Sequence, residues 1–167
     1  MTDFFIETTT KLSQEQQNAA AWVLEVAYAV VDFLEAKKMP VPSFLSDDAW
    51  TCGFRLSDDA EVQQLNKQFR DKDAPTNVLS FPADLSFSEP DEPLYIGDII
   101  FAMPTVAREA AEQGKSPENH LKHLAIHGLL HLFGYDHMED NEAEIMENLE
   151  IALLNTLNIK NPYNSES

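Results

Sequence analysis

The histidines are the residues whose type and spacing point most directly to chemistry. All five lie between positions 120 and 137, and three of them form the pattern His127-x-x-x-His131-x-x-Gly134-x-x-His137 in the segment HGLLHLFGYDH. On an α-helix, His127 and His131 would lie ~40° apart around the axis and ~6 Å apart along it. Two imidazoles at this spacing can share one metal ion, so the pattern predicts a metal-binding helix.

The third histidine needs a turn in the chain to reach the other two. If the helix continued, His137 would lie ~240° around the axis from His131 and ~9 Å further along it. A glycine at position 134 can adopt a left-handed conformation, end the helix and turn the chain back. Three neutral imidazoles leave a fourth zinc position for water, whose pKa falls to about 7 on the metal. We therefore predict one Zn²⁺ per chain, held by His127, His131 and His137.

The residues next to this pattern bear on which reaction the metal site could catalyse. His120 and His123 continue the same helical face toward its start, and we expect each to be solvated or hydrogen-bonded in the core, with His123 the better placed to line the site. The motif resembles the zinc-binding helix of metzincin proteases, which carry a general-base glutamate directly after the first histidine. Here that position is Gly128, which disfavours peptidase chemistry. A glycine within a helix also predicts a close approach by another backbone or by a substrate.

Hydrophobic periodicity and capping residues predict the elements around this helix. We expect strands at residues 3–10, 50–56, 77–81 and 95–102, a loop at 84–93, and helices at 13–38, 59–69, 105–113, 116–134 and 141–157. Asn141 and Glu144 are expected to cap the last helix. Its predicted apolar stripe comprises Ile145, Met146, Leu149, Leu153 and Leu157. The intermixed elements predict one α+β domain over residues 1–159, followed by a frayed tail at 160–167.

Composition excludes several classes of protein. Lys and Arg number 11 against 29 Asp and Glu, and the net charge of −18 disfavours non-specific adhesion to nucleic acid or to an anionic membrane. Apolar residues make up 44% of the chain, which indicates a globular protein and not a disordered acidic tail. We find no apolar run of membrane-spanning length, no signal peptide, and a single cysteine, Cys52. These features predict a cytoplasmic protein.

The metal motif resembles the signature of one family in particular. With Gly128 in the glutamate position and Tyr135-Asp136 before the third histidine, HGLLHLFGYDH is similar to the signature of the YbeY family, bacterial metal-dependent endoribonucleases. Further stretches agree in order and spacing, and the resemblance covers residues 56–157. These stretches are LNKQFR at 65–70, APTNVLSFP at 74–82, IGDI at 96–99, and EIM at 144–146 with Glu150.

The resemblance implies a fold, an activity and a site. The fold is a zincin-like α+β domain, with a mixed β-sheet packed against helices and the metal site on a central helix. The activity is zinc-dependent cleavage of single-stranded RNA in 16S ribosomal RNA 3′ end maturation and late ribosome quality control, with the ribosome or ribosome-associated proteins as partners. Family members depend on an arginine that matches Arg70. A guanidinium suits a phosphodiester because it is always charged and presents a bidentate fork, and Lys67 and Lys72 lie nearby to help hold the phosphate.

Several points stay open at the level of sequence. The nucleophile is a metal-bound water or the substrate 2′-hydroxyl, and no general base is assigned. Asp136 either orients a ligand imidazole or caps a turn, whereas Asp98 is expected in a buried polar network and Met146 in the core. The alternative functions are a zinc metalloprotease-like hydrolase and a non-catalytic, metal-containing ribosome assembly factor. The oligomeric state is not predicted.

The distribution of charge sharpens the argument from composition. Residues 136–150 carry seven acids and no Lys or Arg. Seven of the eleven basic residues lie between the second strand and the metal helix: Arg55, Lys67, Arg70, Lys72, Arg108, Lys115 and Lys122. If the fold gathers part of this group beside the metal, a small positive surface sits in a negative shell. Such an enzyme would bind bulk RNA poorly and would need a presented single strand.

Overall fold

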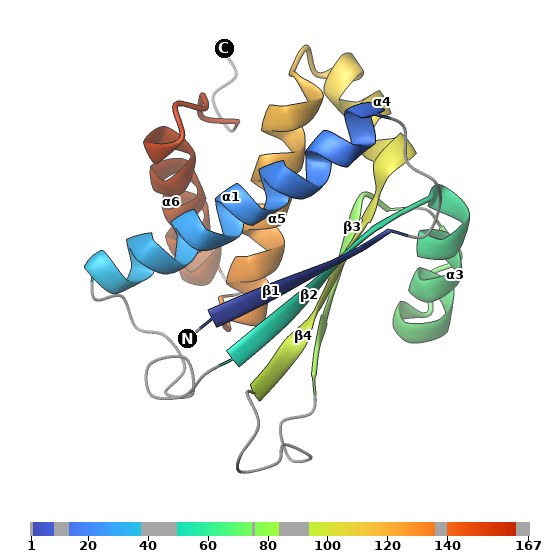
Figure 1. Cartoon of the computed structure of the whole chain (residues 1–167), viewed down its shortest axis with the longest axis horizontal. Coiled ribbons are helices and arrows are strands. Elements are labelled where there is room, and N and C mark those ends of the chain that lie inside the picture. The colour runs from blue at the N-terminus through green and yellow to red at the C-terminus, as the bar shows by residue number, and fades with distance from the viewer. Residues whose placement is uncertain are drawn as a thin grey trace.

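The computed structural model describes residues 2–8, 14–37, 50–74, 76–83, 94–135 and 140–162 (Figure 1). The elements in chain order are β1 Thr2–Thr8, α1 Gln14–Ala36, β2 Trp50–Ser57, α3 Asp59–Arg70, β3 Val78–Pro82, β4 Leu94–Ala102, α4 Met103–Glu112, α5 Pro117–Leu132 and α6 Asp140–Thr156. The predicted α+β class is confirmed. Asp136, His137 and the predicted loop at 84–93 lie outside the described residues.

The described strands form one mixed sheet in the order β1-β2-β4-β3. β1, β2 and β4 run parallel, and β3 pairs antiparallel with β4. In that last pairing Ser80 lies opposite Ile99, and Phe81 lies opposite Asp98. Because strand side chains alternate between faces, Ser80 and Phe81 point to opposite sides of the sheet.

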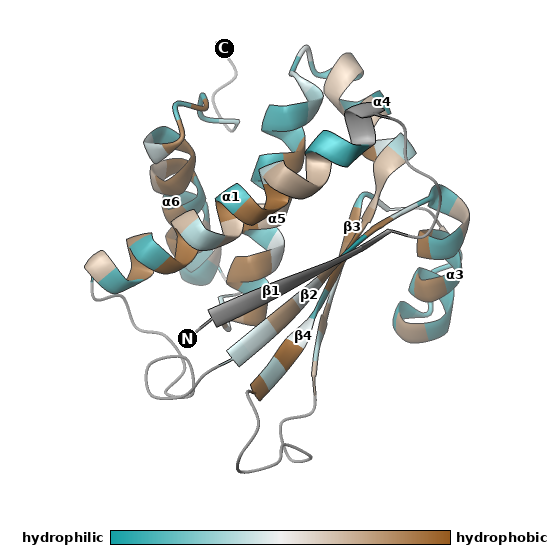
Figure 2. Ribbon diagram, viewed as in Figure 1, coloured by the Kyte–Doolittle hydropathy of each residue, from teal (hydrophilic) through white to brown (hydrophobic). Residues whose placement is uncertain are grey.

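The two faces of the sheet carry cores of different size. One face packs against α1 and α5, and α6 joins this larger core, whereas α3 lies on the other side (Figure 1). The larger core includes Phe54 of β2 and Ile99 and Phe101 of β4. Figure 2 shows apolar segments of the helices in brown. The smaller cluster under α3 comprises Val62, Leu79, Ile100 and Ala102. α5 is the central helix, because it contacts α1, α4, α6, β3 and β4.

Local capping explains where α3 and α5 begin. The Asp58 side chain accepts a hydrogen bond from the Glu61 N–H at 2.8 Å, and Ser116 accepts one from the Asn119 N–H at 3.1 Å. Each bond satisfies a backbone donor that the first turn of a helix leaves without a partner. Pro117 occupies the first position of α5, where its missing N–H costs nothing. These starts agree with the sequence predictions.

The last helix differs from the prediction in two respects. α6 begins at Asp140, so Asn141 lies inside the first turn and is not the residue that caps it. Ile145 is 50% exposed, although Met146, Leu149 and Leu153 are buried as expected. Successive helical residues are ~100° apart, so a stripe that contains Met146 places Ile145 at its solvent boundary. Among the described helices, none is long and apolar enough to cross a membrane.

Candidate metal centre and nuclease site

The end of α5 turns the chain as the glycine predicted. Gly134 has φ of +100°, its N–H donates to the carbonyl of His131 at 3.0 Å, and the Tyr135 N–H donates to the carbonyl of Leu130 at 2.9 Å. This pair of bonds is the Schellman motif, which closes a helix and redirects the chain. His137 follows the turn by three residues and lies outside the described residues.

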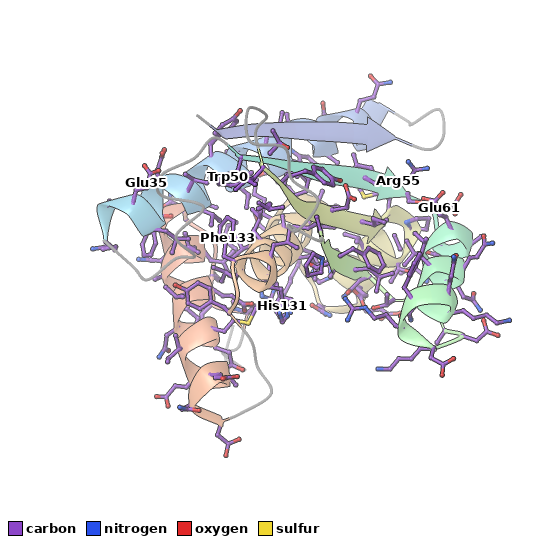
Figure 3. All side chains as sticks on the ribbon, turned by 90° about the horizontal axis from the view of Figure 1, so that it is seen from below. Glu35, Trp50, Arg55, Glu61, His131 and Phe133 are labelled. Atoms are coloured by element: carbon purple, nitrogen blue, oxygen red, sulfur yellow. The ribbon has the colours of Figure 1, made fainter. Side chains whose placement is uncertain are left out.

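His127 and His131 face each other on α5. Their Nε2 atoms are 3.0 Å apart, and their rings meet edge to face with centroids 4.5 Å apart. Both side chains are half-buried, and Figure 3 shows His131 projecting from α5. The predicted histidine pair therefore exists, with one ring nitrogen of each residue directed at the same point.

A buried carboxylate from α6 supports this pair. Glu150 is 0% exposed; its Oε1 lies 2.5 Å from Nδ1 of His127, and its Oε2 lies 3.3 Å from Nε2 of His123. An ionised carboxylate only accepts hydrogen bonds, so both imidazole nitrogens donate to it. The proton on Nδ1 leaves the Nε2 lone pair of neutral His127 directed toward His131. Sequence reasoning gave Glu150 no role, although a glutamate one turn after Met146 in an apolar helix face is a signal for a buried partner.

The donor set fits a zinc ion. Two nitrogens that each lie ~2.0–2.1 Å from a tetrahedral zinc are ~3.3 Å apart, close to the 3.0 Å between the Nε2 atoms of His127 and His131. A carboxylate on the other ring nitrogen is the usual support for a metal-bound histidine, because it fixes the tautomer and the ring orientation. Within the part of the chain that the structure describes, no group of three His, Cys, Asp or Glu side chains is arranged so that it could hold a metal ion. His137 is the third ligand that the sequence predicts.

The first histidine of the cluster lies in a different environment. His120 is buried, and its Nε2 is 2.9 Å from Oε1 of Glu109 on α4, an oxygen that also accepts from the Asn77 side chain at 2.9 Å. Burial lowers the pKa of His120, against the opposing effect of Glu109. His120 thus links α5 to α4 and to the residue before β3, whereas His123 shares Glu150 with His127.

Gly128 is a point of close packing between α5 and the sheet. A Cβ atom at this position would lie 3.0 Å from Cγ2 of Ile99 and 3.1 Å from Oγ of Ser80. The Ser80 hydroxyl donates to the Gly128 carbonyl at 3.3 Å. A close approach exists as predicted, but the groups that approach are side chains of β3 and β4, not the backbone or substrate that the sequence suggested. A larger residue after His127 would displace the edge of the sheet.

Arg70 reaches the edge strand from the other face. It is the last residue of α3, and its Nη2 donates to the carbonyl of Ser80 at 2.6 Å. Its guanidinium carbon lies 5.6 Å from the centre of the Phe81 ring, a cation–π contact, and the residue is exposed. Ser80 therefore connects Arg70, through its carbonyl, to Gly128 on the metal helix, through its hydroxyl.

Most of the other basic residues are engaged by carboxylates. Arg55 lies 2.7 Å from Glu61, and Figure 3 shows this pair beside α3; its hydrogen bond lowers the pKa of the Glu61 carboxyl. The remaining ion pairs are Arg108 with Asp59 at 3.2 Å, Lys122 with Glu25 at 2.9 Å and with Glu118 at 3.4 Å, and Lys67 with Asp73 at 3.9 Å. These basic residues are therefore distributed among separate ion pairs, two of them with acids that lie far away in the sequence. Lys122 is itself part of α5, and Arg70 is linked to α5 at Gly128, the residue after His127, through Ser80.

The structure also shows the surroundings of Cys52, Asp98 and Met146. Cys52 is buried, and burial raises its pKa to about 12, so its thiol is protonated at neutral pH. The half-buried Asp98 accepts a hydrogen bond from the hydroxyl of Tyr95, which is exposed, so the expected network exists here at the surface and not in a buried place. Met146 is 1% exposed and belongs to the larger core.

Comparison with known proteins decides the family. The family model described as Endoribonuclease YbeY matches residues 6–158. The chain belongs to the YbeY family. This match spans Arg70 and all five histidines, and it supports the assignment of a nuclease that acts on RNA.

Individual YbeY relatives agree with this assignment. A protein named Endoribonuclease YbeY from Agrobacterium fabrum is 45% identical over 155 residues, which cover 89% of this chain and 86% of the relative. The protein of the same name from Chelativorans is 55% identical over 108 residues, which cover 65% of this chain and 66% of the relative. The one from Francisella tularensis subsp. novicida is 53% identical over 105 residues, which cover 62% of this chain and 65% of the relative. The solution structure of TM1509 from Thermotoga maritima is 27% identical with a TM-score of 0.51, covering 93% of this chain and 91% of that one.

Proposed function

We propose that the protein is a zinc-dependent endoribonuclease that cleaves single-stranded RNA, with one Zn²⁺ held by His127, His131 and His137. The observation that carries this proposal is the arrangement of His127, whose Nε2 faces Nε2 of His131 at 3.0 Å while its Nδ1 donates to a buried glutamate. A structural histidine pair needs no such orientation. A metal ligand does, because its lone pair must point at the ion.

The residues around the metal site have distinct tasks. When bound, a zinc ion supplies a water that is ionised near neutral pH. Glu150 holds the rings of His123 and His127. Arg70 uses one N–H for Ser80 and has further donors for a phosphate, so it binds the substrate and stabilises the negative charge of the transition state. The nucleophile is water or the 2′-hydroxyl, and a 2′,3′-cyclic phosphate product would exclude direct attack by water in the first step.

We further propose that the RNA is the 3′ end of 16S ribosomal RNA and that the protein acts in ribosome maturation and quality control in the cytoplasm. Membership of the YbeY family supports an RNA substrate, and the choice of 16S ribosomal RNA follows the resemblance of the HGLLHLFGYDH motif. The net charge of −18 agrees with it, because a strongly acidic protein binds bulk RNA poorly and depends on a strand presented by the ribosome or by a ribosome-associated protein.

The test is a metal-content assay paired with cleavage of a single-stranded RNA. We expect about one metal per chain in the wild type, in line with a single three-histidine site. His131→Ala should lose both metal and activity, whereas Arg70→Ala should lose activity and retain the metal. Activity that survives chelation of the metal would contradict the mechanism.

Two alternatives have different signatures. A metalloprotease would need a general base after His127, but a side chain at position 128 would meet Ile99 and Ser80. Peptide turnover that His131→Ala abolishes would restore this alternative. For a non-catalytic assembly factor, His127→Ala would leave the ends of 16S ribosomal RNA normal, and that result would contradict the enzyme proposal.

A further inference from the structure

An exposed aromatic ring lies directly before Arg70 in the chain. Phe69 is 59% exposed, although most large apolar side chains of the described residues are buried. Its ring meets that of Phe81 edge to face, with centroids 5.5 Å apart and planes at 65°. Leaving this much of a phenylalanine in water gives up part of the ~1.5–3 kcal/mol that full burial of such a side chain provides. A ring held in this state is suited to bind something flat and apolar.

Phe81 forms the base of this surface. Its ring packs partly buried against the smaller core cluster under α3, which fixes its position. Phe69 lies at one side of the ring, and the Arg70 guanidinium lies 5.6 Å from its centre. The hydrogen bond from Arg70 to the Ser80 carbonyl at 2.6 Å limits the mobility of the guanidinium. We name Phe69, Arg70 and Phe81 the aromatic–arginine patch.

The chemistry of the patch matches an unpaired nucleotide. An exposed ring offers a face on which a base can stack, and an adjacent arginine offers donors for the phosphate. Lys67 and Arg70 both occur in the last turn of α3, where Lys67 pairs with Asp73 at 3.9 Å and Arg70 lies against the Phe81 ring, so Arg70 is the charged donor of the patch. Bases within a duplex are already stacked on their neighbours and cannot use Phe69 in this way.

The patch is joined to the metal helix through a single residue. The Ser80 carbonyl accepts from Arg70, and the Ser80 hydroxyl donates to Gly128, the residue after His127. The patch and the histidines lie on opposite faces of the sheet, so an RNA strand whose phosphate binds Arg70 and whose base stacks on Phe69 would pass the edge strand β3 to reach the histidines.

We propose that the aromatic–arginine patch binds one unpaired RNA base, stacked on Phe69, and that this contact contributes to the preference for single strands. The inference rests on the proposed endoribonuclease function and adds a base-binding position to it. Phe69 binds the substrate in this scheme and takes no part in bond cleavage.

The test uses the full-length, metal-loaded protein and steady-state cleavage of a short single-stranded RNA. Phe69→Ala should raise KM about tenfold, the usual loss for one base–aromatic stack, with little change in kcat. Phe69→Trp should restore KM, because indole provides a larger stacking surface. Inhibition by a duplex of the same sequence should be equal in wild type and Phe69→Ala. Tyr28→Ala, at a 47% exposed aromatic of α1, is the matched control and should keep wild-type kinetics.

A second measurement ties the effect to one base. Bases are removed from the RNA one at a time, and for the wild type one such abasic position should raise KM. The KM of Phe69→Ala should not rise further with the RNA that lacks this base, because both changes remove the same contact. Unchanged KM in Phe69→Ala, or equal weakening of single strands and duplex, would overturn the inference. If wild-type protein cleaves single-stranded RNA, those results leave the proposed function standing; if it cleaves none, the function itself fails.

Discussion

Nδ1 of His127 lies 2.5 Å from Oε1 of Glu150, and the second oxygen of the same carboxylate lies 3.3 Å from Nε2 of His123. One fully buried acid on α6 therefore orients two imidazoles on α5. A buried charge is tolerated only where hydrogen bonds replace its hydration, and the two imidazole N–H groups do this. The same bonds fix the ring of a proposed metal ligand.

Glu150→Gln should weaken metal binding. The glutamine keeps the shape of the side chain but is neutral, and because His127 and His123 contact different carboxylate oxygens, one of them would face an NH2 group that cannot accept its proton. We expect zinc affinity to fall by about 10- to 100-fold, the usual loss when the carboxylate behind a metal-bound histidine is removed. Competition with a chromophoric chelator measures the dissociation constant. Glu147→Gln, at an exposed position of α6, is the control, and equal affinities of the two variants would contradict the role of Glu150.

Arg70→Ala should reduce kcat by about 100-fold or more, because it removes the charged donor that we propose binds the phosphate. Arg70→Lys should recover only part of this loss, since an ammonium lacks the bidentate fork. Metal content should stay at the wild-type value in both. Arg108→Ala removes another exposed guanidinium, which pairs with Asp59, and should retain activity. A similar loss in Arg108→Ala would indicate a general effect of charge.

Gly128→Ala should destabilise the protein despite a better helix former. Alanine gains about 1 kcal/mol of helix propensity, but overpacking against the fully buried Ile99 and against Ser80 costs about 1–3 kcal/mol. We expect a net loss of about 1 kcal/mol in the free energy of unfolding, measured in urea. If Gly128→Ala were more stable than wild type, β3 and β4 would have to move enough to accommodate the added methyl group at little cost.

His120 should make stability depend on pH. Burial lowers its pKa in the folded state, with small contributions from Lys115 and His123, and Glu109 opposes the shift without reversing it. Protonation would also place an N–H on Nδ1, which has no hydrogen-bond partner among the described residues. The unfolded chain therefore binds the proton more tightly. The stabilisation is complete above the ordinary pKa of 6.5 and is lost as the pH falls from there through the lowered pKa.

The comparison that isolates this effect is urea unfolding of wild type and His120→Gln at about pH 7.5 and about pH 5.5, on either side of the ordinary histidine pKa. The wild type should lose more stability on acidification than the variant, because the other histidines titrate in both. Equal losses would show that His120 does not contribute.

The features that sequence predicts well here are local. Ser116, Pro117 and Gly134 act through backbone groups within a few residues, so the bounds of α5 follow from their order in the chain. The spacing of His127 and His131 likewise becomes a contact on any regular helix.

The features that sequence misses depend on contacts between distant segments. The role of Glu150 requires α6 to pack against α5, and the bonds of Ser80 require β3 to lie beside both α3 and α5. The ion pair of Arg108 with Asp59 has the same origin. No local pattern contains these partners, because tertiary packing selects them.

The two bonds of Ser80 divide the proposed site into two parts that depend on different contacts. The histidine pair belongs to one helix and needs only α6 to support it, whereas Arg70 comes beside that helix only when the short strand β3 has docked on β4. A change that shifts β3 would therefore alter the position of Arg70 and the packing of Gly128 together. The same change would leave the contact between His127 and Glu150 in place, because that contact joins α5 to α6.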